Sequence, residues 1–136
     1  MPPDGTEPIA DDEILYRRIP VSQNWYDPNV SPKPSSQSFH PTKYDTTGLS
    51  LSRGKYTTIE EAAQGTAGKS YYVAVLQAGD LRAQGITLLP KPEVDDPGHC
   101  EIPSLTYQDR NTDQSLESKT LLAEQLCLRV EGPFSS

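Results

Sequence analysis

Two serines and an arginine lie close together in this 136-residue chain, in the segment Leu49–Arg53, where apolar and polar residues alternate. Successive side chains of a strand point to opposite faces, so Ser50 and Ser52 are expected to share one face, with Arg53 at the strand end. Two hydroxyls and a guanidinium could together form a fork for a phosphate or a carboxylate. The alternative is a solvated strand edge that ends in an ordinary surface arginine.

A histidine and a glutamate lie two residues apart at His99 and Glu101. In an extended segment they would share a face and could reach the same substrate. A histidine near a carboxylate suits general acid/base chemistry. A structural role in a loop is the alternative, because Gly98 precedes the pair and Pro103 follows it.

Consecutive arginines occur at Arg17 and Arg18 in a segment that favours a strand. They must point to opposite faces, so one of them can reach an inner surface or a cleft. Alternatively, one is a solvated charge and the stem of the other covers apolar surface. We expect Arg18, Arg53 and Lys55 to be candidate anion-binding groups, and Arg17 to be the candidate catalytic arginine.

Other kinds of site find little support in the sequence. The histidines and cysteines lack the short paired spacings of zinc ligands, so no metal site is predicted. Cys100 and Cys127 allow at most one disulfide, and we expect two reduced thiols. A phosphate-cradling glycine-rich loop, a nucleophile elbow and a metalloprotease helix are all absent, which excludes those enzyme classes.

Hydrophobic patterning predicts short strands and helices that intermix without regular alternation, which favours an α+β domain with a small mixed or antiparallel sheet. Thirteen prolines shorten the regular elements. Strands are predicted at 14–19, 49–53, 71–76, 86–89 and 99–103, with short helices near 57–63 and 79–85 and a C-terminal helix over 113–129.

The net charge of −7 is unevenly distributed along the chain. Residues 1–13 carry five acids and no base, residues 14–58 carry six bases against two acids, and residues 59–136 carry six bases against twelve acids. We interpret residues 1–13 as an acidic mobile arm and residues 14–136 as a single domain. The divided charge either pairs internally in the fold or forms an anion-binding face.

The N-terminus has neither the basic and apolar regions of a secretory signal nor an arginine-rich transit sequence. No apolar run approaches the 18 or more residues of a membrane span, so no membrane association is expected. These features predict a cytoplasmic protein.

The order of Arg17, Ser50-Leu51-Ser52 and Glu101 resembles that of the ADP-ribosyltransferase-like enzymes, including small toxin domains. In that family an early strand supplies an arginine or histidine, and a later strand supplies a Ser-x-Ser element. A distal acidic residue assists transfer from NAD. The resemblance implies NAD as a substrate and Arg17, the Ser50–Ser52 stretch and Glu101 as site residues.

Two functions remain open. The first is a small binding or accessory module that acts through a protein partner and needs no cofactor, because no motif has the specificity of a catalytic constellation. The alternative is a small nucleotide-handling enzyme acting on NAD or a phosphorylated substrate. Its catalytic residues would be Arg17, Ser50, Ser52, His99 and Glu101, and their convergence on one pocket would favour it. Duplex nucleic acid is not an expected partner, because the net charge opposes it.

Overall fold

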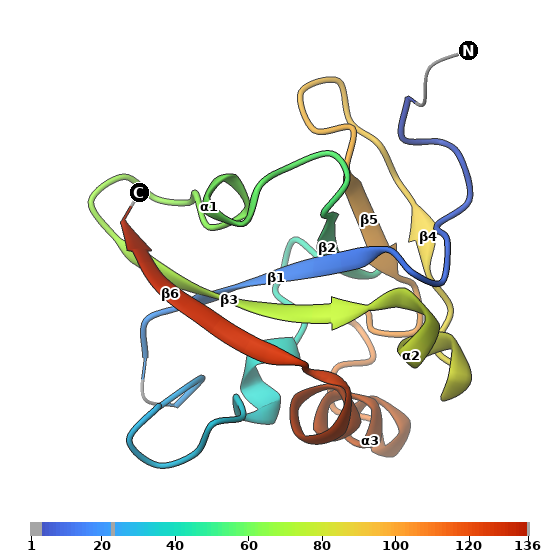
Figure 1. The fold of residues 1–136 in the computed structure, drawn as a ribbon. Helices are drawn as coiled ribbons and strands as arrows, with labels where there is room; N and C mark the ends of the chain where they lie inside the picture. The colour runs from blue at the N-terminus through green and yellow to red at the C-terminus, as the bar shows by residue number, and fades with distance from the viewer. Residues whose placement is uncertain (1–3, 23, 136) are drawn as a thin grey trace.

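A six-stranded antiparallel sheet in the order β4-β5-β2-β1-β3-β6 forms the centre of the molecule (Figure 1). The computed structural model describes residues 4–22 and 24–135. Its strands are β1 (Ile14–Pro20), β2 (Leu49–Arg53), β3 (Ser70–Gln77), β4 (Leu89–Pro90), β5 (His99–Ile102) and β6 (Arg129–Ser135).

The helices are short. They comprise a 3₁₀ helix, η1 (Ser36–Phe39), the α-helices α1 (Ile59–Ala62), α2 (Ala78–Ala83) and α3 (Asp113–Leu121), and a π-helical turn, η2 (Leu122–Leu126). Among the described residues, none of these helices has the length and apolar character needed to cross a membrane.

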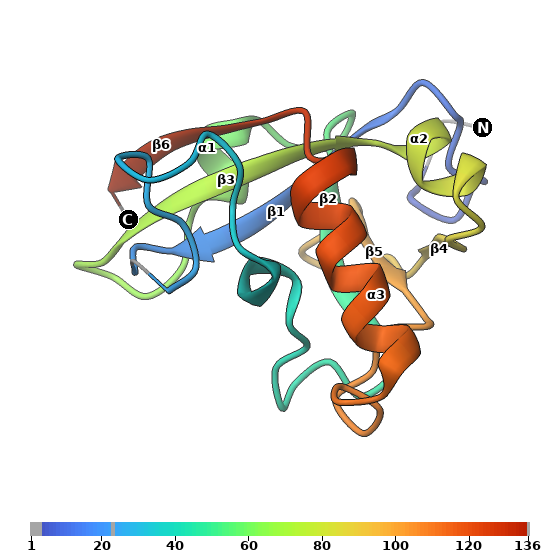
Figure 2. The same cartoon turned by 90° about the horizontal axis from the view of Figure 1, so that it is seen from below.

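The two faces of the sheet are covered differently. On one face, α3, η1 and η2 pack over the main core, to which β1 contributes Leu15 and Ile19 and β2 contributes Leu49 and Leu51. Figure 2 shows α3 crossing this face. The opposite face carries a smaller buried cluster, formed by Ala63, Tyr71 and Val73, against which Ile59 of α1 packs. The rest of that second face is available for polar groups.

Strand β3 is central because its residues are apolar on both faces. Val73, Ala74, Val75 and Leu76 are all fully buried. β3 pairs with β1 along its whole length and with β6 on its other side, with an irregularity between Tyr71 and Val73. A strand buried on both faces reads as a nearly continuous apolar run, as this one does.

The predicted α+β class is confirmed, including the antiparallel sheet and the C-terminal helix. The predictions at 14–19, 49–53, 71–76 and 99–103 correspond to β1, β2, β3 and β5. The prediction of a strand over 86–89 is wrong for residues 86–88, and β4 contains only Leu89 and Pro90. The helix predicted to reach Arg129 ends at Leu126, and β6 follows it.

The acidic N-terminal segment lies along the edge of the fold. Among its described residues, 4–13, Ile9 is only 3% exposed and belongs to the main core. Glu13 forms a 2.7 Å ion pair with Arg53, whose side chain is fully buried. Gly5, at φ 94°, sits so close to the 90–98 loop that a Cβ there would lie 2.1 Å from the Pro97 carbonyl oxygen. These are the contacts of a packed segment, and the mobility of residues 1–13 stays a prediction for experiment.

Candidate functional site

A pocket of about 460 Å³ opens over the second face of the sheet. Four strands and the loops around them contribute to it. Its walls include five of the residues selected from the sequence together with tyrosines and acidic side chains: Tyr16, Arg17, Arg18, Ser50, Ser52, Tyr71, His99, Tyr44, Asp45 and Asp96.

Strand register explains why these side chains meet. Ser52 of β2 lies opposite Tyr16 of β1 on one side and opposite His99 of β5 on the other. Ser50 lies opposite Glu101. Directly opposed residues in an antiparallel pair share a face, so both serines, His99 and Glu101 all belong to the pocket side of the sheet.

The Ser50 hydroxyl is the centre of a hydrogen-bonded chain. Its Oγ donates to Asp45 Oδ1 at 3.0 Å and lies 3.2 Å from Nε2 of His99. The other ring nitrogen of His99, Nδ1, lies 2.9 Å from the carbonyl oxygen of Lys91. Asp45 is held by the Thr42 amide, which donates to its Oδ2 at 2.7 Å. A base, a carboxylate and a hydroxyl therefore meet at one point of the pocket wall.

Arg17 contributes to the pocket lining, although its side chain lies on the core face of β1, the face of Leu15 and Ile19. Its Nε donates to the Ser38 carbonyl at 3.0 Å, and its guanidinium also donates to the carbonyls of Ser50 at 3.1 Å and His40 at 3.4 Å. Among the described residues, no carboxylate forms an ion pair with it. Burial lowers the pKa of Arg17 to about 10. Arg17 is thus a buried cation whose hydrogen bonds go to carbonyl oxygens, and the nearby charge of Asp45 favours its protonated form.

Arg18, unlike the buried Arg17, is exposed and lies at the rim of the pocket. Its guanidinium donates to the Gln64 carbonyl and stacks over the Tyr71 ring, 5.1 Å from the ring centroid. The prediction that the two arginines point to opposite faces agrees with this register, since Arg17 pairs with the core residue Ala74 and Arg18 with Val73.

Glu101 lies next to the pocket without lining it. Glu101 is only 8% exposed, and its Oε1 accepts a 2.8 Å hydrogen bond from the Thr47 hydroxyl. Its place opposite Ser50 nevertheless keeps it one strand spacing from the serine.

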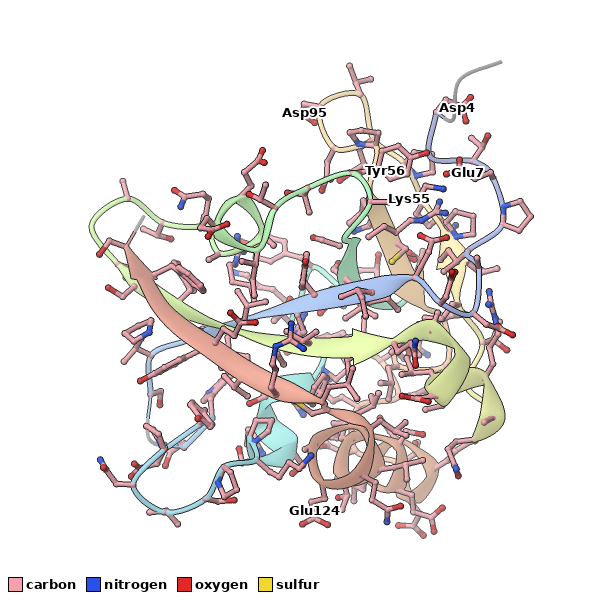
Figure 3. The ribbon with its side chains drawn as sticks, viewed as in Figure 1. Asp4, Glu7, Lys55, Tyr56, Asp95 and Glu124 are labelled. Carbon is pink, nitrogen blue, oxygen red and sulfur yellow. The ribbon has the colours of Figure 1, made fainter. Side chains whose placement is uncertain are left out.

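Arg53 and Lys55 are located elsewhere, at the far end of β2. The Arg53 guanidinium donates to both carboxylate oxygens of Glu13, at 2.8 and 2.7 Å. Lys55 pairs with Glu7 at 2.9 Å. Figure 3 shows Glu7 beside Lys55 and Tyr56. The structure therefore does not bring these two candidate anion-binding groups to Arg18. Both already form ion pairs with carboxylates of the N-terminal segment.

Asp45 is the residue of the pocket that sequence reasoning missed. No role was predicted for Asp45, although its carboxylate lies only five residues before Ser50 in the sequence. An acidic turn residue just before a Ser-x-Ser strand is the signal that could have identified it. Among the described residues, no group of three or more His, Cys, Asp and Glu side chains is arranged to hold a metal ion.

Comparisons with protein-family models, with curated proteins and with solved structures found no significant match to this chain.

Proposed function

We propose that the pocket binds NAD or a related phosphorylated nucleotide, and that the chain is a small nucleotide-handling enzyme resembling the ADP-ribosyltransferase-like domains. One observation carries this proposal. Arg17, Ser50 and Glu101 belong to three neighbouring strands, and the Arg17 guanidinium is bonded to the carbonyl of Ser50, which lies opposite Glu101. These are the positions on which the resemblance rests.

The electrostatics of the pocket support an anionic ligand. Arg17 forms no ion pair among the described residues and has only the charge of Asp45 nearby, so a phosphate close to it would further offset the cost of burying this cation. Arg17 donates one hydrogen bond from each of its three nitrogens to a carbonyl oxygen, and a guanidinium carries five N–H groups, so donors remain for a ligand. Arg18 at the rim adds a second positive charge, and bidentate binding of phosphate suits arginine.

The aromatic lining supports a ligand that carries a flat ring. Tyr16, Tyr44 and Tyr71 contribute to the pocket walls, and Tyr44 is 80% exposed. A nucleobase or a nicotinamide ring can stack on such side chains. Cationic groups and aromatic rings in one pocket together match a nucleotide better than inorganic phosphate alone.

The competing hypothesis of a binding module acting through a protein partner has one observation in its favour. On α3, Leu116 is 46% exposed and lines a shallow site with Leu121 and Gln125. A cytoplasmic location fits either proposal, because Cys100 and Cys127 are both free thiols, as expected in a reducing compartment.

A thermal-shift series tests the nucleotide proposal. A ligand present at about a hundred times its Kd stabilises the native state by about 2.7 kcal/mol, or roughly 10 °C in Tm for a chain of this size. We expect NAD or ADP-ribose to raise the Tm of the wild type, and Arg18→Ala to reduce that rise. Arg82→Ala is the matched control, because Arg82 is a surface arginine paired with Asp11 and is not part of the pocket lining.

Arg17→Met provides a second variant, which keeps much of the buried stem and removes the charge. Its ligand-induced shift should be smaller still. No shift of the wild type with NAD, ADP-ribose or nucleotides at millimolar concentration would contradict the proposal and favour the binding module.

A further inference from the structure

The Ser50 hydroxyl and the His99 ring are arranged as a nucleophile and its base. Nε2 of His99 lies 3.2 Å from Ser50 Oγ, within reach of a hydrogen bond. Nδ1 lies 2.9 Å from the Lys91 carbonyl oxygen. A carbonyl oxygen can only accept, so Nδ1 carries a proton, and in the neutral ring the lone pair of Nε2 then points at Ser50.

Asp45 completes the arrangement around the same hydroxyl. Its Oδ1 accepts the Ser50 hydroxyl proton at 3.0 Å, so this hydroxyl has to turn from Asp45 toward Nε2 of His99 before it can give up its proton there. The Asp45 residue is 4% exposed and is fixed through its Oδ2 by the Thr42 amide. A carboxylate held in this way orients the serine hydroxyl.

Ser50 and His99 are both half-buried and both line the pocket, so an electrophile inside it can reach the hydroxyl. Ser50 is positioned by strand β2 and by its hydrogen bond to Asp45. His99 is positioned by strand β5 and by its contact with the Lys91 carbonyl oxygen. A nucleophile bonded to a base, which is in turn oriented by a third group, is the general pattern of covalent catalysis.

We propose that Ser50 is an activated nucleophile with His99 as its general base, and that it accepts the acyl group of a small ester. Ser50 Oγ forms a bond to the ester carbonyl carbon while its proton passes to Nε2 of His99. The C–O bond to the alcohol then breaks, and the alcohol leaves with that proton. Water cleaves the acyl-serine to a carboxylic acid, which restores the hydroxyl. No oxidant or cofactor is required, and the proposal does not depend on NAD binding.

Covalent labelling of the full chain with phenylmethylsulfonyl fluoride tests this proposal. Serine Oγ bonds to sulfur, the S–F bond breaks, fluoride leaves, and the proton passes through His99 to water. We expect intact-mass spectrometry to show one adduct and peptide mapping to place it on Ser50. Ser50→Ala should abolish the adduct. Ser104→Ala is the matched control, since Ser104 is an exposed serine outside the pocket lining and should leave the labelling rate unchanged.

The role of His99 is tested by rates. Loss of a general base slows such a reaction by about 100-fold or more, so His99→Asn should label at least that much more slowly than wild type. Asp45→Asn, which keeps the shape of the side chain, should change the rate less than His99→Asn does. Circular dichroism and melting curves check that each variant is folded. If a variant does not fold, the position of the adduct on the wild type still tests the proposal.

Three outcomes would overturn the inference: no adduct on the wild type, an adduct that maps away from Ser50, or a rate that falls with Asp45→Asn but not with His99→Asn. Because labelling is read without any nucleotide, its failure is distinguishable from the failure of the thermal-shift series.

Discussion

At the scale of single residues, the Glu7 carboxylate connects the N-terminal segment to the residues that follow β2 (Figure 3). It accepts a hydrogen bond from the Tyr56 hydroxyl and forms ion pairs with Lys55 at 2.9 Å and Arg53 at 3.2 Å. The bond from Tyr56, opposed by some desolvation and assisted by Lys55, lowers the pKa of Glu7 from 4.5 to about 2. The folded state therefore favours the ionised form of this side chain.

This shift predicts acid sensitivity. A carboxylate whose pKa is lower in the folded state stabilises the protein above its unfolded pKa, here 4.5, and that contribution is lost as the pH falls toward 2. We expect the difference in free energy of unfolding between wild type and Glu7→Gln to be largest near about pH 6 and to shrink below pH 4.5. Urea unfolding at several pH values measures it.

Glu60→Gln is the control for that series, because Glu60 is an exposed carboxylate on α1. A Glu7→Gln difference that stayed constant from neutral to acid pH would show that Tyr56 and Lys55 do not hold this carboxylate in its ionised form.

At the scale of elements, local pattern was sufficient where one segment carried its own signal. Strand β2 alternates apolar and polar residues, and its burial alternates in the same way. The α1 helix is capped by Thr58, whose side chain forms a capping box with Glu61. Strand β6 could not be predicted in this way, because Gly132 and Pro133 break its pattern and pairing with β3 defines it.

The N-terminal segment illustrates the same limit. Its acidic, proline-containing composition is typical of a mobile arm. What the composition cannot show is that Arg53 is fully buried and donates to Glu13 and to the carbonyl oxygens of Gly5, Glu7 and Pro8. A buried guanidinium needs these acceptors, so the segment and the end of β2 depend on each other.

Glu13→Gln tests this dependence. Removing one partner of a buried ion pair leaves the other charge uncompensated, and we expect a loss of about 3 kcal/mol in the free energy of unfolding. Asp12→Asn is the matched control, since Asp12 is the exposed neighbour and should change stability by less than about 0.5 kcal/mol. Urea denaturation measures both variants. Equal, small effects would show that the segment contributes nothing to the fold and is mobile.

At the scale of the whole molecule, part of the uneven charge along the sequence is neutralised by ion pairs within the fold. Acids of residues 1–13 meet bases further along the chain, with Glu7 on Lys55, Glu13 on Arg53 and Asp11 on Arg82. Arg17, by contrast, forms no ion pair among the described residues, and Asp45 is the carboxylate whose charge favours its protonated form. The sequence could suggest both alternatives, internal pairing and an anion-binding face, but it could not assign each arginine to one of them.

The pocket shows a similar division between what sequence reasoning reaches and what it cannot. Residue types and spacing were enough to select Ser50, Ser52 and His99, because alternation along a strand is a local property. Their meeting depends on β2 lying between β1 and β5, which is a property of the whole sheet. The contact of Asp45 with Ser50 required the path of a loop, for which no periodic pattern exists.

The two cysteines provide a test of whether the fold opens as one unit. Cys100 of β5 and Cys127, which follows η2, both belong to the main core, although they come from different elements. Burial raises the pKa of Cys127, and it raises that of Cys100 from 9.0 to about 12, which lowers the thiolate fraction of Cys100 near neutral pH about a thousandfold. Native protein should therefore react very slowly with an aromatic disulfide reagent.

Reaction should begin only when the core opens. If residues 14–136 form one cooperative domain, both thiols should become reactive over the same range of urea concentration, and that range should coincide with the fluorescence change of Trp25. Trp25 packs against the same core, so all three probes report on one cluster of side chains. Earlier exposure of Cys127 would instead show that α3, η2 and β6 separate from the sheet before the rest unfolds, and that the single-domain prediction is wrong.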